Sequence, residues 1–261
     1  MKIFPDTENT HMPFIHGTKL YHCRAPLEKR NLDEDIGGYP VENGTLYNAY
    51  DIYVSDLDGQ NLQRIGGGIG DISISCTPTV YSHQGETHLN YVASSTEYRI
   101  RYHYYRRTFS NGQWSGLKRN IDPVGVRVPY CLSENSKYVF VCYPKQNNAR
   151  VFRHNKITNT GQTFHFPNID ILIRAVPVAN NDEVFIITYE KNGKYCSALI
   201  QGEIFKRIKV SGEDVYKCSI LDQTIVYSTK TDDITYLSID TYTLTSENSQ
   251  VRVLNDYSSS D

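Results

Sequence analysis

The feature that most constrains the fold is a strand-rich unit that recurs along the chain. Its clearest copy spans residues 76–120, where four runs rich in Tyr, Val, Thr and Ile are separated by polar turns such as Ser110-Asn111-Gly112-Gln113. Period-two alternation between Gly and Asn turns predicts an antiparallel meander of four strands. A unit of this size matches one blade of a β-propeller.

Each copy of the unit begins at a corner, which in four cases contains a proline. The corners lie at Pro13, Pro78, Pro129, Pro177 and Ser219, so successive copies are 65, 51, 48 and 42 residues apart. The first interval is long because residues 26–47 form an insertion, interpreted as a solvated loop or a lid. The sequence therefore predicts an all-β, five-bladed β-propeller of four-stranded antiparallel blades. The expected blades are residues 11–74, 75–124, 125–171, 172–214 and 215–254.

The absence of a compositional break predicts that residues 1–261 form a single domain. Residues 1–10 are expected to close the ring by adding a strand to the last blade, because closure removes an exposed sheet edge. The six cysteines include no close pair, so we expect buried free thiols, no zinc site and no cofactor.

Charge and terminal composition set expectations about partners and location. The formal net charge is −2 and the pI about 6.4, which predicts neither nucleic-acid binding nor attraction to an anionic membrane. The first residues lack the apolar core of a signal peptide. We therefore expect a cytoplasmic protein, or a component of a virus particle or other assembly that is released without a signal peptide.

The order of these motifs resembles the five-bladed glycoside hydrolases of the arabinanase and β-xylosidase type. Residues 12–15 are similar to the opening of that family's first blade, and residues 52–59 resemble the hairpin that ends it. Residues 85–91 resemble the continuation of the second blade, and residues 175–177 stand where the fourth blade opens. The resemblance implies a five-bladed propeller and, in the family, hydrolysis of glycosidic bonds.

The family's catalytic acids do not carry over to this sequence. The matching positions hold Met12, Thr79 and Ala175, none of which can exchange a proton as the two carboxyl groups of a glycosidase must. The expectation is therefore a protein that is not an enzyme of this type, a pseudoenzyme. Hydrolysis by relocated carboxylates stays open as an alternative.

A different set of residues recurs at the corners. A basic or protonatable side chain stands shortly before four of them, and tyrosines accompany several. Because the first strand of each blade lines the channel of a propeller, we expect these groups to converge at one channel mouth and bind a ligand. The candidate ligand-binding residues are His11, Arg127, Arg174, Lys217, Tyr21, Tyr81, Tyr130 and Tyr216.

Three functions follow from these observations. The first is a non-catalytic binding propeller that recognises a glycan or a small anionic ligand at the channel mouth. The second is an interaction component of a virus particle or other large assembly, with other proteins as partners, and the third is the relocated hydrolase. The sole tryptophan, Trp114, follows an Asn-Gly turn and is expected to pack between blades.

Overall fold

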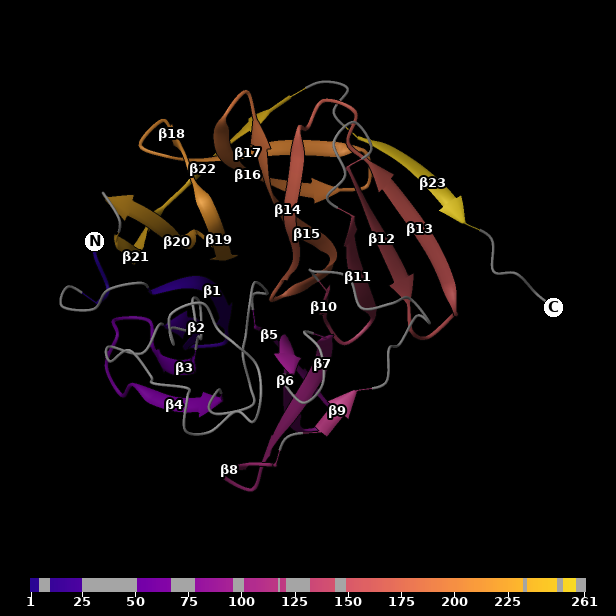
Figure 1. The fold of residues 1–261 in the computed structure, drawn as a ribbon. Helices are drawn as coiled ribbons and strands as arrows, with labels where there is room; N and C mark the ends of the chain where they lie inside the picture. The colour runs from indigo at the N-terminus through magenta and orange to yellow at the C-terminus, as the bar shows by residue number, and fades with distance from the viewer. Residues whose placement is uncertain are drawn as a thin grey trace, which may run out of the picture.

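The computed structural model describes most of the chain. The described residues are 1–4, 10–24, 51–66, 78–95, 101–116, 118–120, 132–143, 149–231, 234–247 and 251–256. These residues form strands, bridges and turns, and none of them belongs to a helix long and apolar enough to cross a membrane. Five antiparallel sheets follow one another around a common centre (Figure 1). The protein is an all-β, five-bladed β-propeller, as the corner spacing predicts.

The first two blades are built from consecutive strands. Blade 1 contains β1 (Thr10–His16), β2 (Lys19–Arg24), β3 (Asp51–Asp56) and β4 (Gln63–Gly66). Blade 2 contains β5 (Thr79–His83), β6 (Glu86–Ser95), β7 (Arg101–Ser110), β8 (Gln113–Trp114) and β9 (Lys118–Asn120), of which the last pairs with β7.

The other three blades each follow the same meander. Blade 3 contains β10 (Leu132–Glu134), β11 (Tyr138–Tyr143), β12 (Arg150–Asn155) and β13 (Thr160–His165). Blade 4 contains β14 (Ile171–Val178), β15 (Asn181–Lys191), β16 (Lys194–Gln201), β17 (Ile204–Val210) and β18 (Glu213–Asp214). Blade 5 contains β19 (Tyr216–Leu221), β20 (Thr224–Thr231) and β21 (Ile234–Thr241).

The first strand of each blade lies at the centre of the ring. β1 contacts β5 and β19, β10 contacts β5 and β14, and β14 contacts β19, so the five inner strands follow one another in a closed circle. Tight turns that connect neighbouring strands within the blades use the left-handed backbone conformation, which asparagine and glycine tolerate best. Asn111 and Asn192, for example, have φ of 52° and are each followed by a glycine with positive φ.

The N-terminus closes the ring on blade 5, as expected. Lys2 forms a bridge with Ser238 of β21, the Ile3 amide donates to the carbonyl of Leu237 at 2.9 Å, and Ile3 and Phe4 are buried. The outer edge of blade 5 is thus occupied by the start of the chain. A cluster that includes Ile15, Leu20, Val226 and Leu237 packs beneath this closing segment and joins blades 5 and 1.

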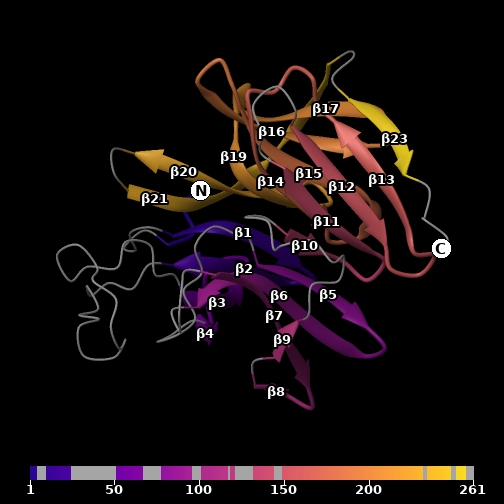
Figure 2. The ribbon, with the colours of Figure 1, turned by 45° about the vertical axis from the view of Figure 1, so that its right-hand side comes forward.

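The C-terminal strands differ from expectation. The expected blade 5 spans residues 215–254, but β22 (Thr243–Ser246) pairs with β17 of blade 4. β23 (Arg252–Asp256) pairs with β13 of blade 3, and the two views show it beside that strand on the outside of the ring (Figures 1 and 2). Because Met1–Phe4 already covers the edge of blade 5, the C-terminal chain instead covers the edges of blades 4 and 3.

Apolar residues fill the spaces between the blades. The largest cluster joins blades 2, 3 and 4, and a separate one joins blades 1 and 2 around Phe14, Ile52 and Leu89. The cysteines that the structure describes, at positions 23, 142, 196 and 218, are buried free thiols, as predicted. The insertion at residues 26–47 lies outside the described residues.

Candidate functional site

A cleft of about 500 Å³ opens between blades 1 and 2. This volume lies within the range of sites for small ligands, about 300–1,000 Å³. Its residues come from the ends of β1, β3 and β7 and the starts of β2, β4 and β6, together with the β8 hairpin. They are His16, Thr18, Lys19, Tyr21, Val54, Ser55, Asn61, Gln63, Thr87, Phe109 and Trp114.

Aromatic side chains form one wall of the cleft. Trp114 lies opposite Phe109 in the β7–β8 hairpin, with ring centroids 5.2 Å apart, and it meets Tyr21 of blade 1 edge to face at 6.5 Å. Tyr21 is buried and Trp114 is half-buried. Trp114 therefore packs between the blades, as expected, while the rest of its surface lines the cleft. Such a flat apolar wall beside polar groups suits an amphipathic ligand.

Polar side chains of blade 1 form a second wall of the cleft. The Lys19 ammonium lies 2.6 Å from Oδ1 of Asp56, and the Asn61 amide donates to Oδ2 of the same carboxylate at 2.6 Å. These hydrogen bonds from Lys19 and Asn61 hold the pKa of Asp56 below its ordinary value, so its carboxylate stays ionised at neutral pH. The wall thus contains a neutralised ion pair rather than a free charge.

The turn that carries this wall is fixed by the closing segment. Gly59 has φ of +86°, and a Cβ at this position would lie 2.9 Å from the carbonyl oxygen of Ile3. Only glycine therefore fits between the turn and the N-terminal strand without displacement. Closure of the propeller and the shape of the cleft are connected at this residue.

His16 also lines the cleft. Its Nε2 is 3.0 Å from the Ser82 hydroxyl in blade 2, so the pair bridges the two blades. Burial lowers the pKa of His16, because the charged imidazolium would lose its hydration. His16 is therefore neutral at neutral pH.

The predicted basic residues do not form this site. Arg174 is 1% exposed, and its guanidinium donates to the Thr188 hydroxyl at 3.1 Å and to the Cys218 carbonyl at 2.7 Å. It joins β14 to β15 and to blade 5, so it offers a ligand no accessible surface. Lys217 has φ of 45° at a β-bulge, and its ammonium lies 4.8 Å from the Tyr216 ring centre.

The other two basic residues are less fully described. His11 lies near the start of β1, five residues before His16, which separates the two by roughly 16 Å along an extended strand. The cleft is therefore at the opposite end of the inner strands from the predicted channel mouth. The side chain of His11 and the whole of Arg127 lie outside the described residues, so convergence of the four basic groups stays a prediction.

The predicted tyrosines are distributed over different parts of the ring. Tyr21 lines the cleft, whereas Tyr81 is buried between blades 2 and 3. Tyr216 packs against Tyr195 of blade 4 with ring centroids 4.9 Å apart. Tyr130 lies outside the described residues. The three described tyrosines therefore pack at three different blade interfaces, and their convergence at one channel mouth stays a prediction.

The positions that match the acids of the glycosidases are all buried. Met12, Thr79 and Ala175 are each at most 3% exposed, and the Thr79 hydroxyl accepts a hydrogen bond from the Glu134 amide at 3.3 Å. Within the part of the chain that the structure describes, no group of three or more His, Cys, Asp or Glu side chains could hold a metal ion.

The interface between blades 2 and 3 contains a buried carboxylate. The Glu134 side chain is 2% exposed and forms an ion pair with Arg106. The Tyr81 hydroxyl donates to Glu134 Oε1 at 3.2 Å, and the Lys156 ammonium lies 3.6 Å from Oε2. These partners come from both blades, so Glu134 fastens one blade to the other.

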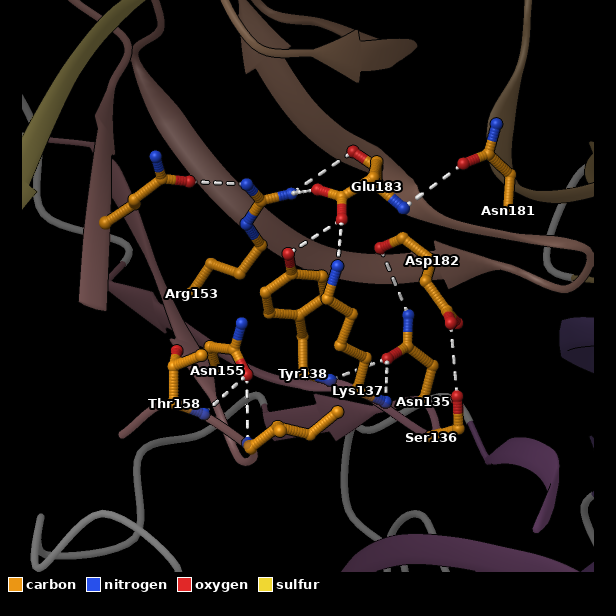
Figure 3. Close-up of polar contacts among 12 residues, drawn as sticks. Asn135, Ser136, Lys137, Tyr138, Arg153, Asn155, Thr158, Asn181, Asp182 and Glu183 are labelled. Carbon is orange, nitrogen blue, oxygen red and sulfur yellow. Dashed lines mark hydrogen bonds and ion pairs between the residues drawn. The ribbon is translucent and has the colours of Figure 1, made fainter. Parts of the chain in front are cut away.

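A second polar network joins blades 3 and 4 (Figure 3). Glu183 of β15 accepts hydrogen bonds from the Lys137 ammonium at 2.5 Å and the Tyr138 hydroxyl at 2.8 Å, and Arg153 lies 3.2 Å from its other oxygen. Asp182 accepts from Ser136 at 3.1 Å. Burial alone would raise the pKa of Glu183, but the hydrogen bonds from Lys137 and Tyr138 keep it below its ordinary value.

Sequence comparison gives no family for this chain. No protein-family model matches it, and no curated protein is significantly similar in sequence. Among solved structures, it is similar to a puromycin-hydrolyzing peptidase of Mycobacterium tuberculosis, with 12% identity and a TM-score of 0.42. The match covers 96% of this chain and 38% of the peptidase, so this chain spans well under half of that protein's length. At this level the similarity carries no argument about function.

Proposed function

We propose that this protein is a non-catalytic binding propeller that recognises a glycan in the cleft between blades 1 and 2. The observation that carries the proposal is the pairing of a half-buried tryptophan with polar side chains across a cleft of about 500 Å³. A pyranose has an apolar face of C–H groups and an equator of hydroxyls. An aromatic plane opposite hydrogen-bonding side chains complements both.

One wall of the cleft would stack against the sugar ring, and the other would form hydrogen bonds with its hydroxyl groups. Trp114 supplies the stacking plane, and its ring packs against those of Tyr21 and Phe109. Asn61 and Gln63 supply amides, which can both donate to and accept from hydroxyl groups. Because Trp114 and Phe109 belong to blade 2 whereas Asn61 and Gln63 belong to blade 1, the site depends on the relative position of the two blades.

A glycan array tests the proposal with two proteins, the wild type and Trp114→Ala. We expect the wild type to bind a defined set of oligosaccharides and the variant to lose about fivefold or more in affinity, since aromatic stacking contributes on the order of 1–3 kcal/mol per ring. The matched control is Tyr195→Ala, which removes an exposed aromatic ring on blade 4. An array without binding would contradict the proposal and favour an interaction component of a larger assembly.

A further inference from the structure

We infer that the cleft selects uncharged sugars over acidic ones, and that Asp56 sets this selectivity by neutralising Lys19. The inference rests on the proposed glycan-binding function and adds the class of ligand. It differs from the expectation of an anionic ligand, which was based on basic residues at the opposite end of the inner strands.

The charges around the cleft support this selectivity. Among the described residues that line it, Lys19 alone carries a permanent charge, and its ammonium is 2.6 Å from the Asp56 carboxylate. Burial keeps His16 neutral at neutral pH by lowering its pKa. An entering carboxylate would therefore lose hydration without meeting a free cation, and Asp56 would repel it.

The geometry of the β3–β4 turn keeps Asp56 in this role. Its two carboxylate oxygens accept from different residues, Lys19 and Asn61, both at 2.6 Å. Its backbone amide donates to the Gln60 carbonyl at 2.9 Å, and its carbonyl accepts from Gly59 at 3.0 Å. Because the backbone is held by the turn itself, replacing the carboxylate with an amide changes the charge and leaves the turn its own hydrogen bonds.

The test measures how Asp56→Asn changes the ligands that the cleft takes. Wild type and variant are titrated with an uncharged oligosaccharide identified on the array and with its sialylated or uronate counterpart. We expect the wild type to prefer the uncharged sugar. The variant should gain roughly three- to tenfold in affinity for the acidic one, because Lys19 is no longer neutralised.

Two further variants separate this effect from a change in net charge or in folding. Asp58→Asn removes the same charge from the same turn, where Asp58 accepts from the Gln60 amide at 3.0 Å, and it should leave selectivity unchanged. Gln63→Lys adds a cation to the exposed β4 wall without altering the turn, and it should reproduce the gain even if Asp56→Asn is unstable.

The outcomes distinguish the inference from the proposed function. A wild type that binds acidic sugars better, or equal gains in Asp56→Asn and Asp58→Asn, would overturn the inference while leaving the glycan site in place. Absence of a gain in both Asp56→Asn and Gln63→Lys would also overturn it. A wild type that binds neither class of sugar would refute the proposed function, and the inference with it.

Discussion

Blades 1 and 2 meet differently from blades 3 and 4. Between blades 3 and 4, hydrogen bonds and ion pairs join Glu183 of blade 4 to Lys137, Tyr138 and Arg153 of blade 3. Between blades 1 and 2, the equivalent space is a cleft bounded by aromatic rings and a neutralised ion pair. The difference shows that one repeated architecture can produce either a fastened interface or a binding site, depending on the side chains between the blades.

The largest expected effect concerns the interface next to the cleft. Glu134→Gln removes a nearly buried charge and leaves Arg106 and Lys156 without their anion. Because Arg106 is partly exposed, we expect unfolding free energy to fall by about 2–4 kcal/mol rather than the full cost of a broken buried pair. Urea denaturation measures this loss. Glycan binding should persist, since Glu134 is absent from the cleft, and a variant as stable as the wild type would contradict the role of Glu134.

A second prediction concerns acid. As the pH falls, blade 1 should lose stability at a higher pH than the interface between blades 3 and 4. His22 of β2 is fully buried against Phe4 and Tyr53, and burial, aided by Arg24, lowers its pKa to about 3. A depressed histidine pKa gives stability that is complete above the unfolded value of 6.5 and is lost as the pH falls toward 3. The loss should reach about 2 kcal/mol at pH 5.

Hydrogen exchange at pH 7 and pH 5 measures this effect locally. Amides of β2 and of the closing segment should lose protection first at the lower pH. The His22→Phe variant should lack this pH dependence, because it has no group to protonate. Equal loss of protection in wild type and variant would show that other groups control the acid sensitivity.

The third prediction separates stability from binding at the cleft. Trp114→Ala should lower unfolding free energy by only about 1–2 kcal/mol, less than for a fully buried aromatic residue, because Trp114 is half-buried. The same substitution should weaken glycan binding by a larger fraction of the binding free energy than the fraction of the unfolding free energy that is lost. Calorimetric melting together with a binding titration measures both. A large fall in stability with unchanged binding would identify Trp114 as a packing residue alone.

The smallest expected effect on stability concerns Glu183 in the polar network between blades 3 and 4. Glu183 has 47% of its side chain exposed, so Glu183→Gln should reduce stability by less than about 1 kcal/mol at neutral pH. Its depressed pKa contributes stability above the unfolded value of 4.5, which is lost as the pH falls through the folded pKa. The variant should therefore approach the wild type once the pH has fallen below the folded pKa of Glu183, which lies under 4.5. A persistent difference at that pH would contradict this assignment.

Local sequence signals predicted the blades but not all of their strands. Turns such as Asn111-Gly112 and Asn192-Gly193 carry their own conformational preference, so the meanders could be recognised without tertiary information. The pairing of β22 and β23 with blades 4 and 3 could not be recognised. This pairing depends on which sheet edges the N-terminus leaves uncovered, and the local sequence of residues 243–256 contains no information about those edges.

The candidate site was harder to predict than the fold. The charge of Arg174 near a corner predicts a contact with a ligand, but its place in the strand directs the side chain between blades, where it is buried. The cleft depends on a gap between two blades, which no single segment encodes. Two signals pointed toward it nonetheless: the only tryptophan of the chain and the Asp-Gly turn at residues 56–59.

The most direct measurement of the proposed site is a fluorescence titration of the wild-type protein. Trp114 is the only tryptophan in the sequence, so its emission reports on the cleft without labelling. Saturating addition of an uncharged oligosaccharide should shift the emission to shorter wavelength with a single binding curve, as stacking removes water from the indole. Binding shown by calorimetry without any change in Trp114 emission would place the ligand elsewhere and contradict the cleft as the site.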